Sequence, residues 1–211
     1  MDVSNISVNV HSSICIDVGK KIYIDPFEIE GKTFDADYIF VTHDHYDHYS
    51  PKDISKIIKN DTKIIIPQPM EKKVSKDFPD TELITVIPGR GYETKDFSFE
   101  TVAAYNVLKP FHSKKAGWVG YILNIDGKKI YIAGDTDVTN EAEQVKCDIA
   151  MVPIGGFYTM NYKDAAKLIN KIRPAYAIPV HYGKLTGKPE DREKFKELVD
   201  NDIKVELKIM F

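Results

Sequence analysis

The chain has 211 residues, of which 43% are hydrophobic and 29% are charged, and its formal net charge is -3. A chain of this length buries roughly 70% of its unfolded surface in one core, so residues 1–211 are expected to form a single domain. The small negative charge excludes a strong overall attraction to nucleic acid, which is therefore not an expected partner.

No segment of the sequence approaches the roughly 20 apolar residues that span a bilayer, and no basic region followed by an apolar run stands at its start. A cytoplasmic protein without membrane contact is expected. The two cysteines, Cys15 and Cys147, each lie in an apolar run that is typical of a strand. We expect both thiols to be buried and chemically inert.

Alternating apolar residues predict three strands at residues 5–10, 14–18 and 21–24, which form an antiparallel meander. Residues 38–42 are almost wholly apolar, as is typical of a strand buried on both faces, and they end at a histidine-rich loop. Ser50 then caps a predicted helix that has Pro51 at its first position and Ile54, Ile57 and Ile58 on its buried side.

The remaining sequence predicts more strands and two more helices. The predicted strands are residues 63–66, 83–87, 97–104, 117–125, 128–133, 175–180 and 203–211. The predicted helices are residues 164–172 and 188–199, and Asp126-Gly127 predicts a hairpin turn.

A short repeat suggests that the two halves of the chain are related. Residues 19–24 and residues 127–132 are both Gly-Lys-Lys-Ile-Tyr-Ile, and each copy is followed by an acidic loop. The order of helix, apolar strand and polar loop also recurs in the second half, ahead of His181. Two packed sheets with helices outside fit this pattern, and no linker rich in Pro, Gly or Ser separates the halves.

The strongest chemical signal is Thr-His-Asp-His-Tyr-Asp-His at residues 42–48. Neutral imidazole and carboxylate groups suit zinc and similar divalent ions. In an extended stretch His43, His45 and Asp47 share one side, and a turn after Asp47 brings His48 round. A solvated loop is the alternative, but the other histidines also fall beside predicted strand ends: His11, His112 and His181.

His-x-His-x-Asp-His after an apolar strand resembles the signature of the metallo-β-lactamase superfamily. Asp25 in Ile-Asp-Pro is similar to the family's early acidic residue, which supports the metal loop. His112 precedes a strand, as the family's isolated third histidine does. Asp135 in Ala-Gly-Asp-Thr resembles the bridging acid, and His181 in Ile-Pro-Val-His-Tyr-Gly resembles the last histidine.

This resemblance implies an α+β fold, a four-layer αβ/βα sandwich in which two mixed β-sheets pack face to face with helices outside. A narrower resemblance within the superfamily is to the small bacterial and archaeal hydrolases that include ascorbate-6-phosphate lactonase. The residues that carry it are His11-Ser12-Ser13, Asp25-Pro26, Pro153-Ile154-Gly155-Gly156 and Met160.

The resemblance also implies two divalent metal ions. One would be held by His43, His45 and His112, the other by Asp47, His48 and His181, with Asp135 as the bridge. Zinc fits these ligands, with Mn²⁺ and Fe²⁺ as alternatives.

The implied activity is that of a metal-dependent hydrolase, in which a metal-bridging hydroxide cleaves a small ester, lactone or phosphodiester. Asp47 is the candidate catalytic residue, because it can orient the water as well as bind metal. His11, Asp25 and Tyr158 are candidates for supporting the ligands or contacting the substrate.

Several alternatives stay open. Lys109, Lys114 and Lys115 fit either a positive rim for an anionic small-molecule substrate or an ordinary solvated loop. His112 lacks the family's Pro-Gly-His-Thr context. If His112 does not bind metal, His11 is its substitute as a ligand, although a role beside the ligands or toward the substrate is preferred for His11. A metal-dependent nuclease that processes RNA and a diiron redox protein are the alternative activities, although His45 at the usual glutamate position favours zinc-type hydrolysis. The sequence leaves a homo-oligomer open.

Overall fold

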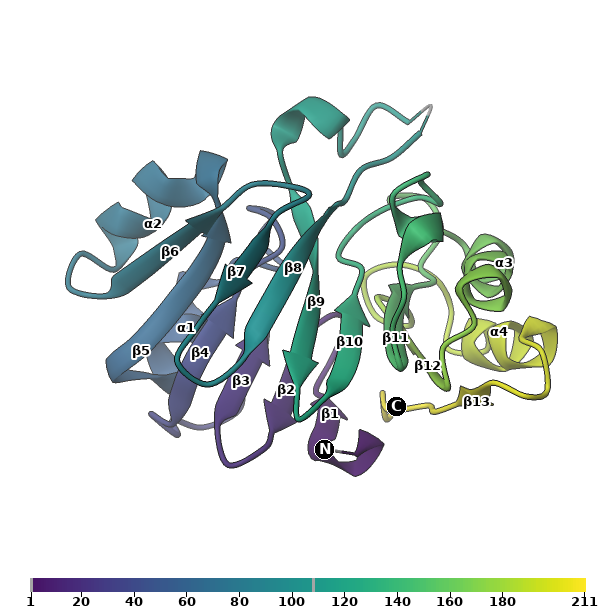
Figure 1. Cartoon of the computed structure of the whole chain (residues 1–211), viewed down its shortest axis with the longest axis horizontal. Helices are drawn as coiled ribbons and strands as arrows, with labels where there is room; N and C mark the ends of the chain where they lie inside the picture. Colours follow the sequence, from purple (N-terminus) through teal and green to yellow (C-terminus); the bar gives the residue numbers. More distant parts are fainter. Residues whose placement is uncertain (1, 108) are drawn as a thin grey trace.

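Two mixed β-sheets lie face to face, and the helices cover their outer sides (Figure 1). The structure is a computed structural model, and it describes residues 2–107 and 109–211. The arrangement confirms the α+β sandwich that the sequence predicted. Among the described residues, no helix combines the length and apolarity that crossing a bilayer requires.

The first sheet has six strands in the order β1-β2-β3-β4-β5-β6, of which β1 to β3 are antiparallel and β3 to β6 parallel. Its strands are β1 (Ile6–Val8), β2 (Ile14–Asp17), β3 (Lys21–Ile24), β4 (Ala36–Phe40), β5 (Ile58–Pro67) and β6 (Glu82–Val86). Its helices are η1 (Val3–Asn5), α1 (Pro51–Ile57), η2 (Gln68–Met70) and α2 (Glu71–Asp77).

The second sheet has seven strands in the order β13-β12-β11-β10-β9-β8-β7, antiparallel from β7 to β10 and parallel from β10 to β13. Its strands are β7 (Gly91–Glu93), β8 (Ser98–Ala103), β9 (Val119–Ile125), β10 (Lys128–Ile132), β11 (Ile149–Pro153), β12 (Tyr176–Val180) and β13 (Lys204–Val205). Its helices are η3 (Lys114–Ala116), η4 (Ala142–Gln144), α3 (Tyr162–Ile172) and α4 (Asp191–Leu198).

The sequence repeat occupies equivalent places in the two sheets. Strand β3 is antiparallel to the strand before it and parallel to the strand after it, and β10 has the same two kinds of neighbour. In each half a helix, α1 or α3, then connects two parallel strands. The repeat therefore marks the strand at which each half changes from antiparallel to parallel pairing.

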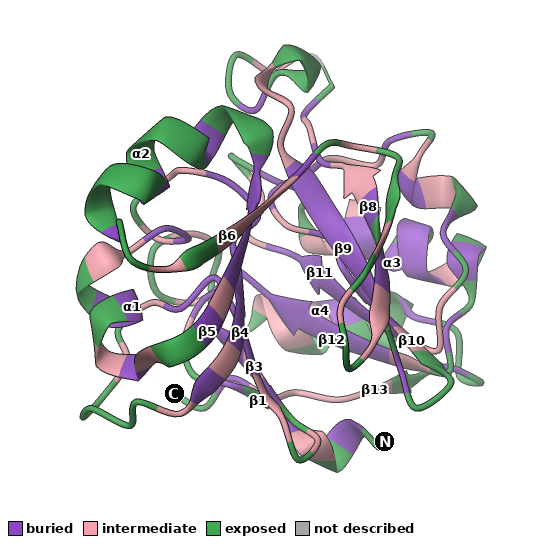
Figure 2. Cartoon of the chain, turned by 60° about the vertical axis from the view of Figure 1, so that its left-hand side comes forward, coloured by how far each residue is buried: buried purple, intermediate pink, exposed green. Residues whose placement is uncertain are grey.

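The apolar residues of strand β4 pack into two different cores, one on each face of the sheet. Tyr38 and Phe40 point into the core between the sheets, where the Phe40 ring lies 4.9 Å from Tyr121. Ile39 belongs to the second core, which packs under the outer helix α1 through residues such as Ile54. Because both faces of this strand are buried (Figure 2), the loop that follows it leaves a rigid support.

Some predicted elements differ from the structure. Residues 203–211 were expected to form one long strand, but only Lys204–Val205 pairs with β12. The alternation beyond it reflects packing instead, since Ile209 is buried and the Phe211 ring lies 5.6 Å from Tyr182. Helix α2, strand β7 and the first part of β5 were not predicted, because these segments carry many polar residues.

The two thiols are only partly buried, so the expectation of full burial was wrong. Both cysteines are free. Burial raises the pKa of Cys147 to about 12 and also raises the pKa of Cys15. Both thiols therefore stay protonated at neutral pH.

Candidate metal centre

The predicted site residues follow the carboxyl ends of parallel strands. Asp25 follows β3 and His43 lies shortly after β4 in the first sheet, whereas Asp135 follows β10 and His181 follows β12 in the second. Parallel strands place their carboxyl ends at one edge of a sheet, where ligands commonly bind. Since the sheets face each other, four segments distant in sequence arrive at one place.

A tight turn shapes the histidine-rich loop between β4 and α1. The backbone N–H groups of His48 and Tyr49 both donate to the carbonyl oxygen of His45, at 3.0 and 2.7 Å. Ser50 then caps α1 by accepting a hydrogen bond from the backbone of Asp53 at 3.3 Å. The turn brings the His48 ring to 4.0 Å from the His43 ring.

Backbone contacts between the sheets hold this loop in place. Val119 of β9 donates its N–H to the carbonyl of Thr42 at 3.3 Å, and Tyr121 donates its hydroxyl to Val41 O at 2.7 Å.

Four site residues have a positive φ, which costs free energy in non-glycine residues and is common at functional sites. They are His11 (56°), Asp25 (47°), His112 (59°) and His181 (58°).

The structure brings all seven predicted ligand residues together, and His11 lies with them. The ligand atoms fall into three overlapping groups in which every atom lies within 4.8 Å of the others. These groups are His11, Asp47, His48 and His181; His43, His45 and His112; and His43, His48 and Asp135.

Asp135 occupies the middle of this arrangement. Its carboxylate oxygens lie 3.1 Å from His181 Nε2 and 3.3 Å from His48 Nε2. The Nε2 atoms of His43 and His112 are each 3.9 Å from Oδ2 of the same carboxylate. One carboxylate thus faces ligand atoms from both predicted metal positions, as a bridging ligand must.

Three buried ring nitrogens at the centre have no hydrogen-bond partner among the described residues: the Nε2 atoms of His43, His48 and His181. The opposite nitrogen of each ring is occupied. His48 Nδ1 lies 2.7 Å from Asp25 Oδ2, His43 Nδ1 lies 2.9 Å from Thr42 Oγ1, and His181 Nδ1 lies 3.1 Å from Thr186 Oγ1.

These contacts indicate that Nδ1 of each ring carries a hydrogen. Thr42 donates its hydroxyl hydrogen to Asp25 at 2.6 Å, so its oxygen accepts from Nδ1–H of His43. A neutral ring with its hydrogen on Nδ1 presents the Nε2 lone pair to the centre, and His48, whose pKa is raised, would release its Nε2 proton when a cation binds. Buried lone pairs without partners are costly, and a bound divalent cation would satisfy them. The donor set therefore fits a metal.

Asp25 supports the ligands without joining the three groups. Besides His48, its carboxylate accepts hydrogen bonds from the backbone N–H of Thr42 at 2.8 Å and from the Thr42 hydroxyl. This contact explains why an acid is needed directly after β3. Such partners of metal-binding histidines raise ligand basicity and fix ring orientation.

The buried charges shift one another strongly. Burial opposes the ionisation of Asp135, but His181 and His48 hold the pKa of its carboxyl well below the usual range. Burial acts to lower the pKa of His48, yet the Asp135 and Asp25 carboxylates raise it well above its ordinary value. Burial and the neighbouring His48 lower the pKa of His43. The centre is therefore an anionic carboxylate surrounded by imidazoles, which suits a cation.

A tryptophan that the sequence reading did not select backs the second group of histidines. The Trp118 ring centre lies 5.0 Å from the rings of His43 and His45 and 5.1 Å from that of His112. Nδ1 of His45 and Nε2 of His112 are 3.1 Å apart. Trp118 precedes β9, and its place beside three histidines could not be read from local spacing.

His11 contacts a predicted ligand directly. Its Nε2 lies 3.0 Å from Oδ2 of Asp47, and its ring centre lies 3.7 Å from that of His181. Burial holds the pKa of His11 at about 4 despite this contact, while the hydrogen bond from His11 helps to lower the pKa of Asp47 to about 2 against the effect of burial. A neutral His11 thus donates Nε2–H to the Asp47 carboxylate.

A pocket of about 400 Å³ opens onto these side chains. Asp47, Asp135 and three of the histidines form its polar part, and Tyr158 lies in its wall. The complete lining is His45, Tyr46, Asp47, Phe111, His112, Asp135, Tyr158, His181, Leu185 and Thr186. This volume suits a small molecule.

Comparisons with known proteins agree with this geometry. The family described as the beta-lactamase superfamily domain matches residues 5–181. A UPF0173 metal-dependent hydrolase of Thermoplasma acidophilum is 32% identical, over 93% of this chain and 92% of its own length.

Solved structures show the same fold. One from Parabacteroides distasonis has a TM-score of 0.79 and 31% identity, and covers 97% of this chain and 93% of that chain. The metallo-beta-lactamase fold protein YhfI from Bacillus subtilis has a TM-score of 0.74 at 12% identity, over 94% of this chain and 88% of its own. The second similarity concerns the fold alone.

Proposed function

Because the chain belongs to the metallo-β-lactamase superfamily and is a metal-dependent hydrolase of the UPF0173 group, we propose that it binds two divalent cations, with zinc as the leading candidate, and hydrolyses a small ester, lactone or phosphodiester. The observation that carries this proposal is the convergence of unpartnered Nε2 atoms of His43, His48 and His181 around Asp135.

Each cation would have three ligands of its own, and Asp135 would be a ligand to both cations. His43, His45 and His112 would hold one cation, and Asp47, His48 and His181 the other. Counted with Asp135, each cation would have four protein ligands, and zinc can accept water or substrate as a fifth ligand. Two such cations supply Lewis acidity and lower the pKa of a shared water towards about 7.

Asp47 has a position that suits a role beyond ligation. Both Asp47 and Asp135 line the open pocket, but Asp47 is the less buried of the two, and His11 holds one of its carboxylate oxygens. A carboxylate fixed in this way can accept a hydrogen bond from a water at the pocket floor and take up a proton from it. We assign His11 the role of positioning Asp47. Asp25 would position His48.

The test begins with elemental analysis of the purified protein before and after reconstitution with zinc, manganese or iron. The expected stoichiometry is near two. Hydrolysis of an ester, lactone and phosphodiester panel should require the metal, cease with a chelator and be abolished by Asp47→Ala. Cleavage confined to long RNA would instead support a nuclease.

Asp44→Asn is the matched control, because Asp44 lies in the same loop but contributes no atom to the three ligand groups. This variant should keep the metal content and the activity. Failure of the reconstituted wild-type protein to bind any divalent cation would refute the proposal.

A further inference from the structure

The pocket above the metal-binding side chains has an apolar mouth. Beyond the ligand residues and Thr186, its wall consists of Tyr46, Phe111, Tyr158 and Leu185. No lysine or arginine lines this pocket within the described part of the chain. An anionic substrate would therefore meet only the metal ions as counter-charges.

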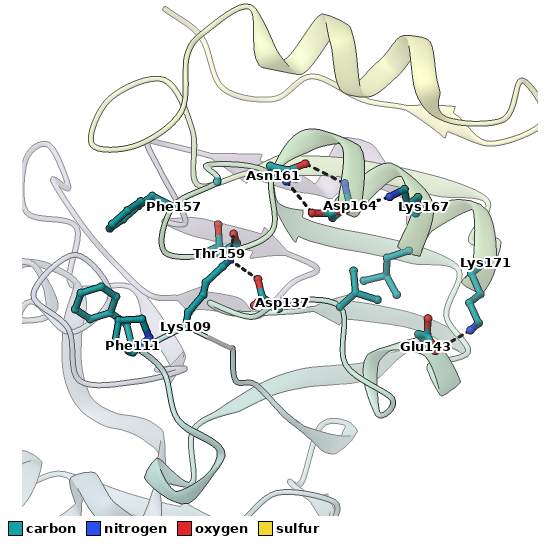
Figure 3. A pocket seen from close by; sticks show the side chains of 14 residues that line it. Lys109, Phe111, Asp137, Glu143, Phe157, Thr159, Asn161, Asp164, Lys167 and Lys171 are labelled. Carbon is teal, nitrogen blue, oxygen red and sulfur yellow. Dashed lines mark hydrogen bonds and ion pairs between the residues drawn. The ribbon is translucent and has the colours of Figure 1, made fainter. Parts of the chain in front are cut away.

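Two of the nearby lysines, Lys109 and Lys114, are paired with carboxylates. Lys109 donates to the carboxylate of Asp137 and, at 2.8 Å, to the carbonyl of Thr159 (Figure 3). Lys114 donates to Glu141 at 2.5 Å. The ammonium groups of both lysines are therefore paired with carboxylates.

Three aromatic rings cluster at the mouth. The ring centre of Phe111 lies 5.3 Å from that of Tyr158 and 6.3 Å from that of Phe157, and the latter two are 4.9 Å apart. Phe157 is 72% exposed, and Tyr46 across the pocket is 68% exposed. Large apolar side chains gathered at a pocket and open to solvent commonly mark a binding surface.

The backbone beneath these rings is held by polar contacts. Asn106 donates its side-chain N–H to the carbonyl of Tyr158 at 2.6 Å, and Lys109 binds the next carbonyl, that of Thr159. The exposed rings are therefore displayed by a fixed segment. Preorganised aromatic groups bind apolar ligands at a low cost in conformational entropy.

Figure 3 shows a second cavity, of about 800 Å³, and Phe111 lines both this cavity and the first one. Phe157 stands in its wall, and Val138 and Leu168 add apolar surface. Its charged lining residues are paired with one another, as in the ion pair of Lys171 with Glu143 at 2.7 Å. An apolar group that passes Phe111 would find room here without meeting an unpaired charge.

From this arrangement we infer that the substrate is an uncharged carboxylic ester or lactone with an extended alkyl or aryl acyl group, which binds against Phe111, Phe157 and Tyr158. This inference rests on the proposed hydrolase function. In the reaction, the oxygen of water bonds to the carbonyl carbon and the bond from that carbon to the leaving oxygen breaks. The leaving oxygen gains a proton, so an ester gives an acid and an alcohol, and a lactone gives a single hydroxy acid.

The first experiment uses the metal-loaded protein with p-nitrophenyl acetate, hexanoate and decanoate, and with the anionic diester bis(p-nitrophenyl) phosphate. Each methylene that becomes buried should raise kcat/KM by about fourfold until the cavity is filled. The double variant Phe111→Ala/Phe157→Ala should lose most of the decanoate-to-acetate ratio. Phe34→Ala should keep that ratio, because Phe34 is also exposed but lines neither cavity.

A binding measurement separates this inference from the hydrolase proposal. Calorimetric titration of chelator-treated protein with the uncharged amide decananilide should show binding, and the double variant should bind at least tenfold more weakly. Hydrolysis without chain-length dependence, or with preference for the anionic diester, would overturn the inference and leave the hydrolase function intact. If no substrate is hydrolysed despite bound metal, the hydrolase function fails, and lack of decananilide binding would overturn the inference as well.

Discussion

His181 donates its backbone N–H to the carbonyl oxygen of His11 at 2.9 Å, and the two imidazole rings lie 3.7 Å apart. His11 lies in the turn after β1 of the first sheet, and His181 follows β12 of the second. The contact therefore joins the two sheets at the site itself, so the ligand geometry depends on how the halves of the chain pack.

Replacing His11 should weaken one metal position more than the other. In His11→Ala, Asp47 loses its Nε2–H donor, and affinity at the position of Asp47, His48 and His181 should fall about 10- to 100-fold. His11→Gln, which keeps a donor group, should lose less. Cobalt titration followed by absorption spectroscopy measures the two positions, and circular dichroism checks the fold. Equal weakening of both positions would argue against a role through Asp47.

The close approach of Gly155 to His181 predicts a steric effect. A Cβ at Gly155 would lie 2.3 Å from the carbonyl oxygen of His181 and 2.3 Å from Thr186 Oγ1. Gly155→Ala should therefore displace the His181 ring and reduce zinc affinity at least tenfold. Gly91→Ala is the control, because a Cβ there meets no atom within 4 Å. Competition with a chromophoric chelator measures both variants, and unchanged affinity in Gly155→Ala would contradict the prediction.

Asp25→Asn should lower both stability and metal affinity. The carboxylate accepts from His48 Nδ1 and from two donors of Thr42, and an amide cannot satisfy all three. The free energy of unfolding should fall by about 1–3 kcal/mol. Urea denaturation of the chelator-treated protein measures this change. Asp17→Asn, at an exposed acid on β2, should change the stability little, and equal effects of both substitutions would count against the assigned contacts.

The stability of the chelator-treated protein should fall on acidification between pH 6.5 and pH 4. Burial holds the pKa of His11 and of His112 at about 4, whereas the ordinary value is 6.5. Between these values the unfolded chain binds protons that the folded protein does not, so each residue removes up to about 1.4 kcal/mol per pH unit. His48, whose pKa is raised in the folded protein, does not add to this loss, because the folded state binds its proton at least as firmly as the unfolded chain does.

Denaturation series at pH 7, 5.5 and 4.5 measure this dependence. The variant His112→Asn carries one fewer titrating imidazole, and its slope should be shallower by up to one proton. A wild-type stability that does not change over this range would contradict the assigned protonation.

Local pattern was sufficient for much of the fold. The unbroken apolar run of β4 predicted burial on both faces, and the repeated Gly-Lys-Lys-Ile-Tyr-Ile predicted a related role for β3 and β10. The polar segment at α2 and the short edge strand β7 were missed, because their formation depends on neighbours rather than on a local apolar period.

The sequence by itself determined which donor groups are available and that four of them share one loop, since His43, His45, Asp47 and His48 are neighbours in the chain. Only the tertiary structure decided how distant groups meet. His11 contacts Asp47, which is 36 positions away in the sequence, and Lys109 forms an ion pair with Asp137. Such contacts depend on how the two sheets pack and on where their loops lie, and the spacing of residues in the sequence predicts neither.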